Sequence, residues 1–380
     1  MLSCQKRLFS LPDDVHYLNC ASMSPLPKSV EAAGIAGLIR KSRPYEITQE
    51  SYFEGVDRVK ALFARLINAT PERVAIIPSV SYGMAVVARN LRAQPGQHIL
   101  LVEGEFPSDY YAWEDVCRRQ NLTVRTVADP KENRAPEWNR RLLDAITEET
   151  ALVVLAPLNW SDGVLFDVAA VGRRCRETGT LFVLDGTQSV GAYPVDVAAL
   201  QADALVVAGY KWLMSAYSLG LAWYGPAFDE GDPIEYTWIN RKGAEDFRRL
   251  MTYTSDYRSG ASRYSMGEQS NFIQIPMLEE GLRLLLEWTP EGVQTYCREL
   301  VRTETAHWQS MGYILEDESN RASHLFGLKH PDLSPDRLRE ALGRHRVFIS
   351  TRGTTLRIAP HVFNTPEDVL ALTRALKDSL

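Results

Sequence analysis

Three segments decide the fold: ALVVLAPLN at residues 151–159, TLFVLDGTQS at 180–189 and ALVVAGYKW at 204–212. Each contains a nearly continuous apolar run rich in Val and Leu, which is typical of a strand buried on both faces. Between the first two lies VAAVGRRCRETG at 168–179, which has the pattern of a helix ending at a glycine. Strands that alternate with helices predict βαβ units, and therefore an α/β fold with a mostly parallel sheet flanked by helices.

The same alternation extends to both sides of these segments. Apolar residues at helical spacing predict a helix over 48–68, and Thr289 followed by Pro290 is typical of an N-cap with proline at the first helical position. Four more short apolar runs predict strands at 74–78, 98–103, 122–128 and 219–225.

The character of the sequence changes near Asn271. A long helix predicted over 272–288 leads into shorter strands and helices, which predict a smaller α+β unit. We therefore expect a large domain at 20–270, and a linking helix with a small C-terminal domain at 271–380. Residues 1–19 are expected to pack on the small domain.

Composition excludes several classes of protein. Hydrophobic residues make up 45% of the 380 residues and charged residues 24%, which is ordinary for a soluble globular chain. The net charge of -6 gives no whole-molecule positive field for nucleic acid. No apolar run approaches the roughly 20 residues that span a bilayer, and the first residues lack the apolar core of a signal peptide. We expect a cytoplasmic protein that binds neither membrane nor nucleic acid.

The five cysteines are widely spaced and form no C-x-x-C pair. This pattern indicates neither a disulfide framework nor a zinc site, and no metal is expected.

Two charged residues follow successive strands of the predicted sheet. Asp185 ends one apolar run and Lys211 follows the next, and the carboxyl ends of parallel strands meet at one edge of a sheet. Taken alone, Asp185 could be a helix N-cap and Lys211 a surface lysine. Together they form the pair that a pyridoxal 5'-phosphate (PLP) enzyme needs, since a lysine in apolar surroundings becomes nucleophilic and a carboxylate keeps the pyridine nitrogen protonated.

With this pair identified, the sequence resembles the class V aminotransferase family of fold-type I PLP enzymes. That family includes cysteine desulfurases, kynureninases and isopenicillin N epimerase-like proteins. The resemblance implies a large PLP-binding domain, a small C-terminal domain, and a homodimer with shared active sites. It rests on seven motifs in order: YLNCASMSPLP (17–27), EFPSDYYAW (105–113), LNWSDG (158–163), DGTQSVGAYPVD (185–196), AGYKWL (208–213), RYSMGEQSNF (263–272) and LRIAPHVFNT (356–365).

The resemblance also implies roles for individual residues. Lys211 is similar to the lysine that holds PLP as a Schiff base, and Asp185 to the partner of the pyridinium nitrogen. Gln188 and Asn159 match positions that hydrogen-bond the phenolic oxygen of the cofactor. Phe106 stands where the family stacks an aromatic ring over the cofactor's face; core packing is the alternative for this side chain.

Phosphate contacts are expected from three places in the chain. Ser81 and Tyr82 lie between a strand and a helix, where free N–H groups and the helix dipole favour an anion; the family often has two small polar residues there, so Tyr82 is a departure. Tyr210 stands where kynureninases contact the phosphate with Tyr and cysteine desulfurases have His. Glu268 or Gln269 resembles a residue that reaches the partner subunit's phosphate.

The substrate side of the site is predicted from three segments. Arg357 matches the small-domain arginine that binds the substrate α-carboxylate, for which its planar fork is suited; a surface arginine is the alternative reading. Asn19 and Ala21 would line the same pocket, and Arg352 is a weaker second candidate.

The type of reaction is less strongly specified. A class V aminotransferase acting on an amino acid is the first choice. The stretch RVFISTRGTTLRI at 346–358, where a desulfurase carries its mobile cysteine, contains none. A C–S or C–C lyase or hydrolase that is cysteine lyase-like or kynureninase-like and has no catalytic cysteine remains open, as does an isopenicillin N epimerase-like enzyme. A non-catalytic regulatory protein is disfavoured because Lys211 is present.

Overall fold

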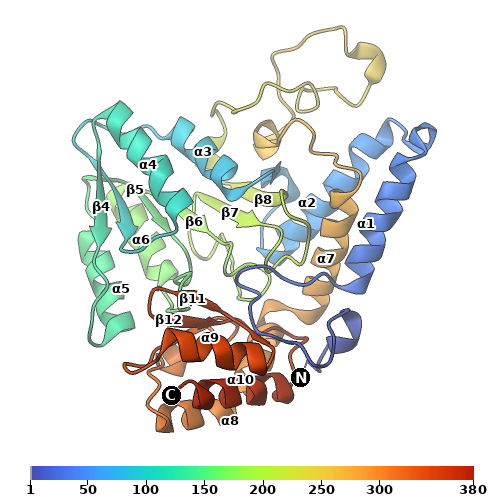
Figure 1. The fold of residues 1–380 in the computed structure, drawn as a ribbon. Coiled ribbons are helices and arrows are strands. Elements are labelled where there is room, and N and C mark those ends of the chain that lie inside the picture. The colour runs from blue at the N-terminus through green and yellow to red at the C-terminus, as the bar shows by residue number, and fades with distance from the viewer. Residues whose placement is uncertain (1) are drawn as a thin grey trace.

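The computed structural model describes residues 2–380, and its centre is a seven-stranded sheet (Figure 1). The strand order is β2-β8-β7-β6-β5-β3-β4. β8 is antiparallel to both neighbours, and the other neighbouring pairs are parallel, so the predicted α/β fold is confirmed. Each predicted apolar run contains one strand: β2 (Val74–Ile77), β3 (His98–Val102), β4 (Thr123–Val127), β5 (Thr150–Leu155), β6 (Leu181–Asp185), β7 (Ala204–Ala208) and β8 (Gly220–Tyr224).

Helices cover both faces of this sheet. Alternate strand residues point to opposite faces, and in β5 Val153 and Leu155 belong to one core while Leu152 and Val154 belong to the other. The first core also contains residues of α2 (Glu54–Leu66), α5 (Arg134–Ala145), α6 (Val168–Thr178) and α7 (Gln274–Trp288), and the second contains residues of α3 (Val80–Asn90) and α4 (Pro107–Gln120).

The helix ends follow from local sequence. The side chain of Asp167 caps α6 by accepting a hydrogen bond from a backbone N–H of its first turn. The helix ends at Gly179, whose φ of 69° is a left-handed conformation that glycine adopts without steric cost. Thr289 caps α8 (Pro290–Ser310) in the same way, so the N-cap expected there is confirmed.

The C-terminal elements lie together below the central sheet in Figure 1. Strands β11, β12 and β9 form an antiparallel sheet, and with α8, α9 and α10 they enclose a separate apolar cluster. These elements are β9 (Phe326–Leu328), α9 (Pro335–Arg344), β10 (Val347–Phe348), β11 (Ser350–Arg352), β12 (Thr355–Ile358) and α10 (Pro366–Asp378).

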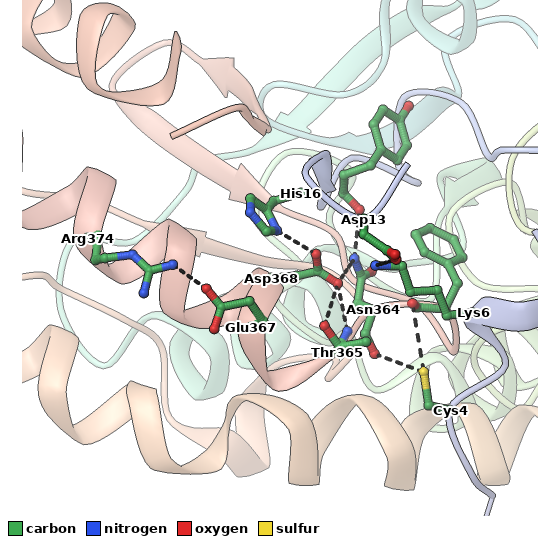
Figure 2. A network of polar contacts seen from close by, with 11 residues as sticks. Cys4, Lys6, Asp13, His16, Asn364, Thr365, Glu367, Asp368 and Arg374 are labelled. Atoms are coloured by element: carbon green, nitrogen blue, oxygen red, sulfur yellow. Dashed lines mark hydrogen bonds and ion pairs between the residues drawn. The ribbon is translucent and has the colours of Figure 1, made fainter. Parts of the chain in front are cut away.

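A polar network joins the N-terminal segment to α10 (Figure 2). β1 (His16–Tyr17) pairs in parallel with β10, and His16 Nδ1 lies 2.7 Å from Asp368 Oδ1. The other oxygen of Asp368 accepts the backbone N–H of Thr365 at 2.7 Å, which completes a capping box at the start of α10. Asn364 donates to the backbone carbonyl of Tyr17. This network, which we call the Asp368 network, fixes the chain two residues before Asn19.

Two helices were not predicted. α1 (Lys28–Lys41) has apolar residues on more than one side: Gly34 and Gly37 pack closely against the Phe272–Met277 region, whereas Ile35, Leu38 and Ile39 are 52%, 56% and 51% exposed. α5 carries a usable pattern, since Trp138, Leu142 and Ala145 are buried at helical spacing.

The expected division of the chain between residues 270 and 271 stays a prediction. α7, which follows that point, packs on α1 and α2 as well as on α8. Within residues 2–380 no helix has the length and apolar composition needed to cross a bilayer.

Candidate active site

A pocket of about 250 Å³ opens where the parallel strands β5, β6 and β7 end. The rule for open α/β sheets places ligands at this edge. The turn after β6, the turn after β7 and the starts of α3 and α4 form its walls. It brings together six of the predicted residues, which are Ser81, Phe106, Asp185, Gln188, Tyr210 and Lys211.

Lys211 lies in an environment that disfavours its charge. Its side chain is 8% exposed, and burial lowers its pKa to about 8 although Asp185 opposes the shift. Nζ lies 5.7 Å from the ring centroid of Phe106 and 5.5 Å from that of Tyr210. A substantial fraction of an amine with this pKa is neutral near pH 8, so Lys211 is suited to nucleophilic attack on an aldehyde.

Asp185 is the last residue of β6, and its carboxylate lines the pocket. Oδ1 accepts the backbone N–H of Thr187 at 2.8 Å, which is an Asx turn and not the start of an α-helix. The side chain is therefore fixed at the strand end and faces the same space as Lys211.

Two amides flank this pair, but only one lines the pocket. Gln188 is held on both sides, because Nε2 donates to the carbonyl of Ala21 at 3.0 Å and Oε1 accepts from Trp212 Nε1 at 2.8 Å. Asn159 is absent from the pocket lining, and its Oδ1 accepts from the backbone N–H and the hydroxyl of Ser161 at 2.9 and 2.6 Å. Ala21 thus adjoins the site through its backbone.

The start of α3, where the anion site was predicted, lines one end of the pocket. The N-cap is Ser79, whose Oγ accepts the backbone N–H of Tyr82 at 3.2 Å and lies 3.0 Å from the Oγ of Ser81. The side chain of Tyr82 does not line the pocket; it packs in the second core near Tyr224, and burial raises its pKa. The two hydroxyls available at this end are those of Ser79 and Ser81.

Arg357 lies on β12 and is 1% exposed. Nε donates to Ser350 Oγ at 3.0 Å and Nη1 to the carbonyl of Trp160 at 3.1 Å, whereas Nη2 has no acceptor within residues 2–380. Burial lowers the pKa of Arg357 to about 10. Asn19 Oδ1 is likewise buried with no donor in the part of the chain that the structure describes. A buried cationic donor with a free N–H is what a carboxylate ligand requires.

Trp160 connects this arginine to the pocket. Its ring lies edge-on to Phe106 at 5.4 Å, with the guanidinium carbons of Arg352 and Arg357 at 5.6 and 6.0 Å from its centroid. Among the described residues, the hydrogen bond of the Arg352 side chain goes to the carbonyl of Thr351 at 2.8 Å.

Glu268 and Gln269 do not reach this pocket within one chain. Gln269 is 1% exposed and donates to Asn240 Oδ1 at 2.9 Å, and Glu268 is exposed. Their contact with a partner subunit stays a prediction.

No cysteine of residues 2–380 lines the pocket, and all five are free thiols. Cys20, Cys117, Cys175 and Cys297 are buried, and burial raises the pKa of each. Such thiols are mostly protonated and poorly nucleophilic.

Ser79, Glu105, Trp160 and Thr187 are among the pocket residues that the sequence analysis did not single out. Ser79 carried a signal, since it immediately precedes a predicted helix as an N-cap does. Thr187 lies within the quoted DGTQ motif. Glu105 and Trp160 adjoin predicted residues, but no spacing rule identifies them.

The chemistry of these residues fits PLP. The pocket offers an amine of lowered pKa, a carboxylate for the ring nitrogen, hydroxyls at a helix N-terminus for the phosphate, and nearby a buried arginine with an unused donor. Fold and site together define a PLP-dependent enzyme of fold type I.

The chain belongs to the aminotransferase class V family, whose sequence model matches residues 41–372. The resemblance proposed from the motifs is therefore confirmed, and PLP is the cofactor of this family.

Similar proteins differ in their reactions. An uncharacterized aminotransferase, YcbU of Bacillus subtilis, is 25% identical over 319 residues, which cover 81% of this chain and 79% of that protein. Isopenicillin N epimerase of Amycolatopsis lactamdurans is 25% identical over 97% of this chain and 96% of its own. A solved mutant of C-DES, with glycine covalently linked to its PLP cofactor, superimposes with a TM-score of 0.85 at 20% identity, covering 99% of this chain and 100% of that one. The superposition with C-DES shows that the two chains share a fold.

Proposed function

We propose that the chain is a class V aminotransferase that moves the amino group of an amino acid to a 2-oxo acid. The observation that carries the proposal is the position of Lys211, a buried amine with a pKa of about 8 that lines one pocket with Asp185. An amine of this kind both holds an aldehyde cofactor and transfers protons near neutral pH.

When bound, PLP supplies an electron sink that lowers the barrier to breaking bonds at the α-carbon of an amino acid. Asp185 would hold the proton on the ring nitrogen. Ser79 and Ser81, with the N-terminus of α3, would bind the phosphate. The amide of Gln188, fixed by Ala21 and Trp212, would orient the ring through its phenolic oxygen.

The substrate would be held by Arg357, which lies beside the pocket, and by the pocket's aromatic residues. Nη2 of Arg357 is free to bind the α-carboxylate, with Nε and Nη1 already fixing the plane of its fork. Phe106 and Trp160 form an aromatic wall that would cover the ring and exclude water. Nζ of Lys211 would then accept the α-proton and return it within the pocket.

A C–S or C–C lyase or hydrolase, cysteine lyase-like or kynureninase-like and without a catalytic cysteine, is the second candidate. It uses the same lysine as its base, and it is favoured over a persulfide-forming desulfurase because no thiol among residues 2–380 lines the pocket.

We also propose that two copies form a homodimer with shared active sites. Large apolar side chains remain exposed on α1 and on the segment around 236–253, including Tyr236, Trp238, Met251 and Tyr253, which are 67%, 42%, 85% and 90% exposed. Figure 1 shows this segment extending from the top of the molecule. Light scattering coupled to size exclusion should give twice the chain mass of 42.8 kDa.

The reaction is tested by product analysis. PLP-loaded protein is incubated with ¹⁵N-labelled amino acids and a 2-oxo acid, and mass spectrometry follows the label. Transfer of ¹⁵N to the acceptor supports an aminotransferase. Release of ammonia with pyruvate or sulfide supports the lyase, and loss of optical activity without either supports an epimerase.

A further inference from the structure

His324 is a fully buried histidine that has no part in the proposed reaction. It lies two residues before β9, among the C-terminal elements, and is 0% exposed. Its Nε2 lies 2.8 Å from the backbone carbonyl of Gln188, a pocket residue 136 positions earlier in the chain. Its ring also packs edge-on against Trp212, with the two centroids 4.5 Å apart. His324 therefore contacts both the turn after β6 and the residue that follows Lys211.

The neighbours of the His324 ring fix its tautomer. Gln294, on α8, accepts the backbone N–H of Ser323 through Oε1 at 3.0 Å and donates through Nε2 to the carbonyl of Ala192 at 2.6 Å. The same Nε2 lies 2.6 Å from His324 Nδ1, and an amide nitrogen can only donate. Nδ1 is therefore unprotonated, and the proton is on Nε2, which donates to the carbonyl of Gln188. Burial lowers the pKa of His324 to about 4, so the ring is neutral near pH 7.

The side chain of Gln188 has one donor left for a ligand. Its Oε1 accepts from Trp212 Nε1 at 2.8 Å, and its Nε2 donates to the carbonyl of Ala21 at 3.0 Å. An amide nitrogen carries two N–H groups, and the second one has no acceptor within residues 2–380. The direction of this N–H depends on the backbone of the turn and on the Trp212 ring, which are the two groups that His324 contacts.

We propose that His324 is a positioning residue, which holds the Gln188 turn and the Trp212 ring so that the free N–H of Gln188 is directed at the phenolic oxygen of the cofactor. The contact of Gln188 with that oxygen belongs to the proposed function, so the purpose of His324 rests on it, whereas the tautomer and its hydrogen bond do not. An N–H that donates to the phenolic oxygen disperses its negative charge. Without it, the oxygen holds the proton of the neighbouring Schiff base more tightly, and the pH midpoint of the cofactor's visible absorption rises.

His361 provides a matched control. It is also 0% exposed, and its ring lies 5.6 Å from that of Trp212. Neither of its ring nitrogens has a hydrogen-bond partner within residues 2–380. Two buried histidines thus pack against one tryptophan, and of the two His324 alone bonds the turn that carries Gln188. The variant His361→Phe removes a buried imidazole beside Trp212 and leaves that hydrogen bond in place.

Ring ¹⁵N NMR of the seven histidines tests the contact in the absence of PLP. The signals that are missing from His324→Gln should be those of a neutral ring protonated at Nε2. They should not change between about pH 6 and 9, the range in which an ordinary histidine loses its proton. A His324 ring protonated at Nδ1, or one that titrates in this range, would overturn the proposal.

The holoenzyme tests the purpose. His324→Phe should weaken PLP binding about fivefold or more and raise the pH midpoint of the visible absorption by about 0.5–1 unit, the equivalent of one hydrogen bond. His324→Gln, whose amide nitrogen can replace Nε2, should keep both parent values, as should His361→Phe. If the Phe and Gln variants of His324 behave alike, or if His361→Phe gives the same shift, His324 only fills space and the proposal fails.

Gln294→Leu covers the case in which His324→Phe does not fold. It removes the amide that fixes the tautomer, at a position outside the pocket lining. The midpoint should rise here too, by a smaller amount, and an unchanged midpoint would overturn the proposal. If the parent chain takes up no PLP while its His324 signals are as expected, the proposed function fails and the contact between His324 and Gln188 stands.

Discussion

The Asp368 network and the surroundings of the Lys211 pocket differ in whether their buried polar atoms have hydrogen-bond partners. In the network, both oxygens of Asp368 have partners, on His16 and on the backbone of Thr365 (Figure 2). Around the pocket, Arg357 Nη2 and Asn19 Oδ1 are buried within the described chain with no partner. Buried polar groups are normally satisfied, so Arg357, which contacts Trp160 of the pocket wall, has a donor available for a ligand.

The same contrast appears in the energetics. Burial lowers the pKa of Lys211 to about 8 and that of Arg357 to about 10, so their charged forms are less stable in the fold than in water. Each therefore opposes folding at neutral pH. The Asp368 network stabilises the fold, and the pocket has a cost in stability that function requires.

Of the variants considered, Lys211→Ala should have the largest effect on turnover. Loss of the amine removes the covalent hold on PLP and the proton-transfer group, so turnover should fall by at least about 10³-fold. The melting temperature of the apoprotein should not fall, because a disfavoured buried charge is removed. Steady-state kinetics and calorimetry measure both, and substantial residual turnover would move the catalytic role to another residue.

The pH dependence of the free energy of unfolding tests the lowered pKa of Lys211. The folded-state pKa of about 8 lies below the ordinary lysine pKa of 10.5, so between these values the unfolded chain binds more protons at Lys211. The contribution of Lys211 to the free energy of unfolding is therefore lowest below pH 8 and rises as the pH increases toward 10.5. Parent apoprotein should show this rise relative to Lys211→Ala in urea unfolding, and identical profiles would contradict the lowered pKa.

Asp368→Ala should have the largest effect on the structural side. It removes a capping box and leaves His16 without its partner, which should lower the free energy of unfolding by about 2–4 kcal/mol. Glu367→Ala is the matched control, since this neighbour forms an exposed pair with Arg374 and should change stability by less than about 0.5 kcal/mol. Equal effects of the two variants would show that the network is not a stabilising unit.

Arg357→Ala should affect binding more than stability. Loss of a charge-assisted contact of about 1.5–3 kcal/mol should raise KM for the amino acid by about 10- to 100-fold. PLP affinity and the melting temperature should change little. Arg352→Ala serves as the comparison and should raise KM less. A parallel loss of PLP binding in Arg357→Ala would identify a structural arginine.

Phe106→Leu should have the smallest effect. An aromatic contact contributes about 0.5–1.5 kcal/mol beyond its area, so PLP affinity should fall by about 3- to 10-fold. Phe106 is 36% exposed, so stability should not change measurably. A lowered melting temperature with unchanged PLP affinity would assign the ring to core packing.

Sequence predicted the sheet and six residues of the pocket, because these depend on local pattern. Apolar runs locate strands, and the end of a strand locates Asp185 and Lys211 in a parallel sheet. Sequence could not identify Trp160, since its position depends on contacts between segments far apart in the chain. α1 was missed because its apolar residues serve both the core and an exposed surface.

The side chain of Tyr82 illustrates the same limit. Tyr82 lies in the first turn of α3, where the anion site was predicted, and its backbone N–H donates to the N-cap Ser79. The direction of its ring depends on how α3 packs against the sheet, which no local rule determines.

Chemical fixation of the cofactor is the most direct test that the pocket around Lys211 is the active site. Apoprotein is loaded with PLP, reduced with borohydride and digested, and the labelled peptide is sequenced by mass spectrometry. We predict one pyridoxyl group per chain, on Lys211. A chain that takes up no PLP, or one labelled on another lysine, would contradict the assignment of this pocket as the active site.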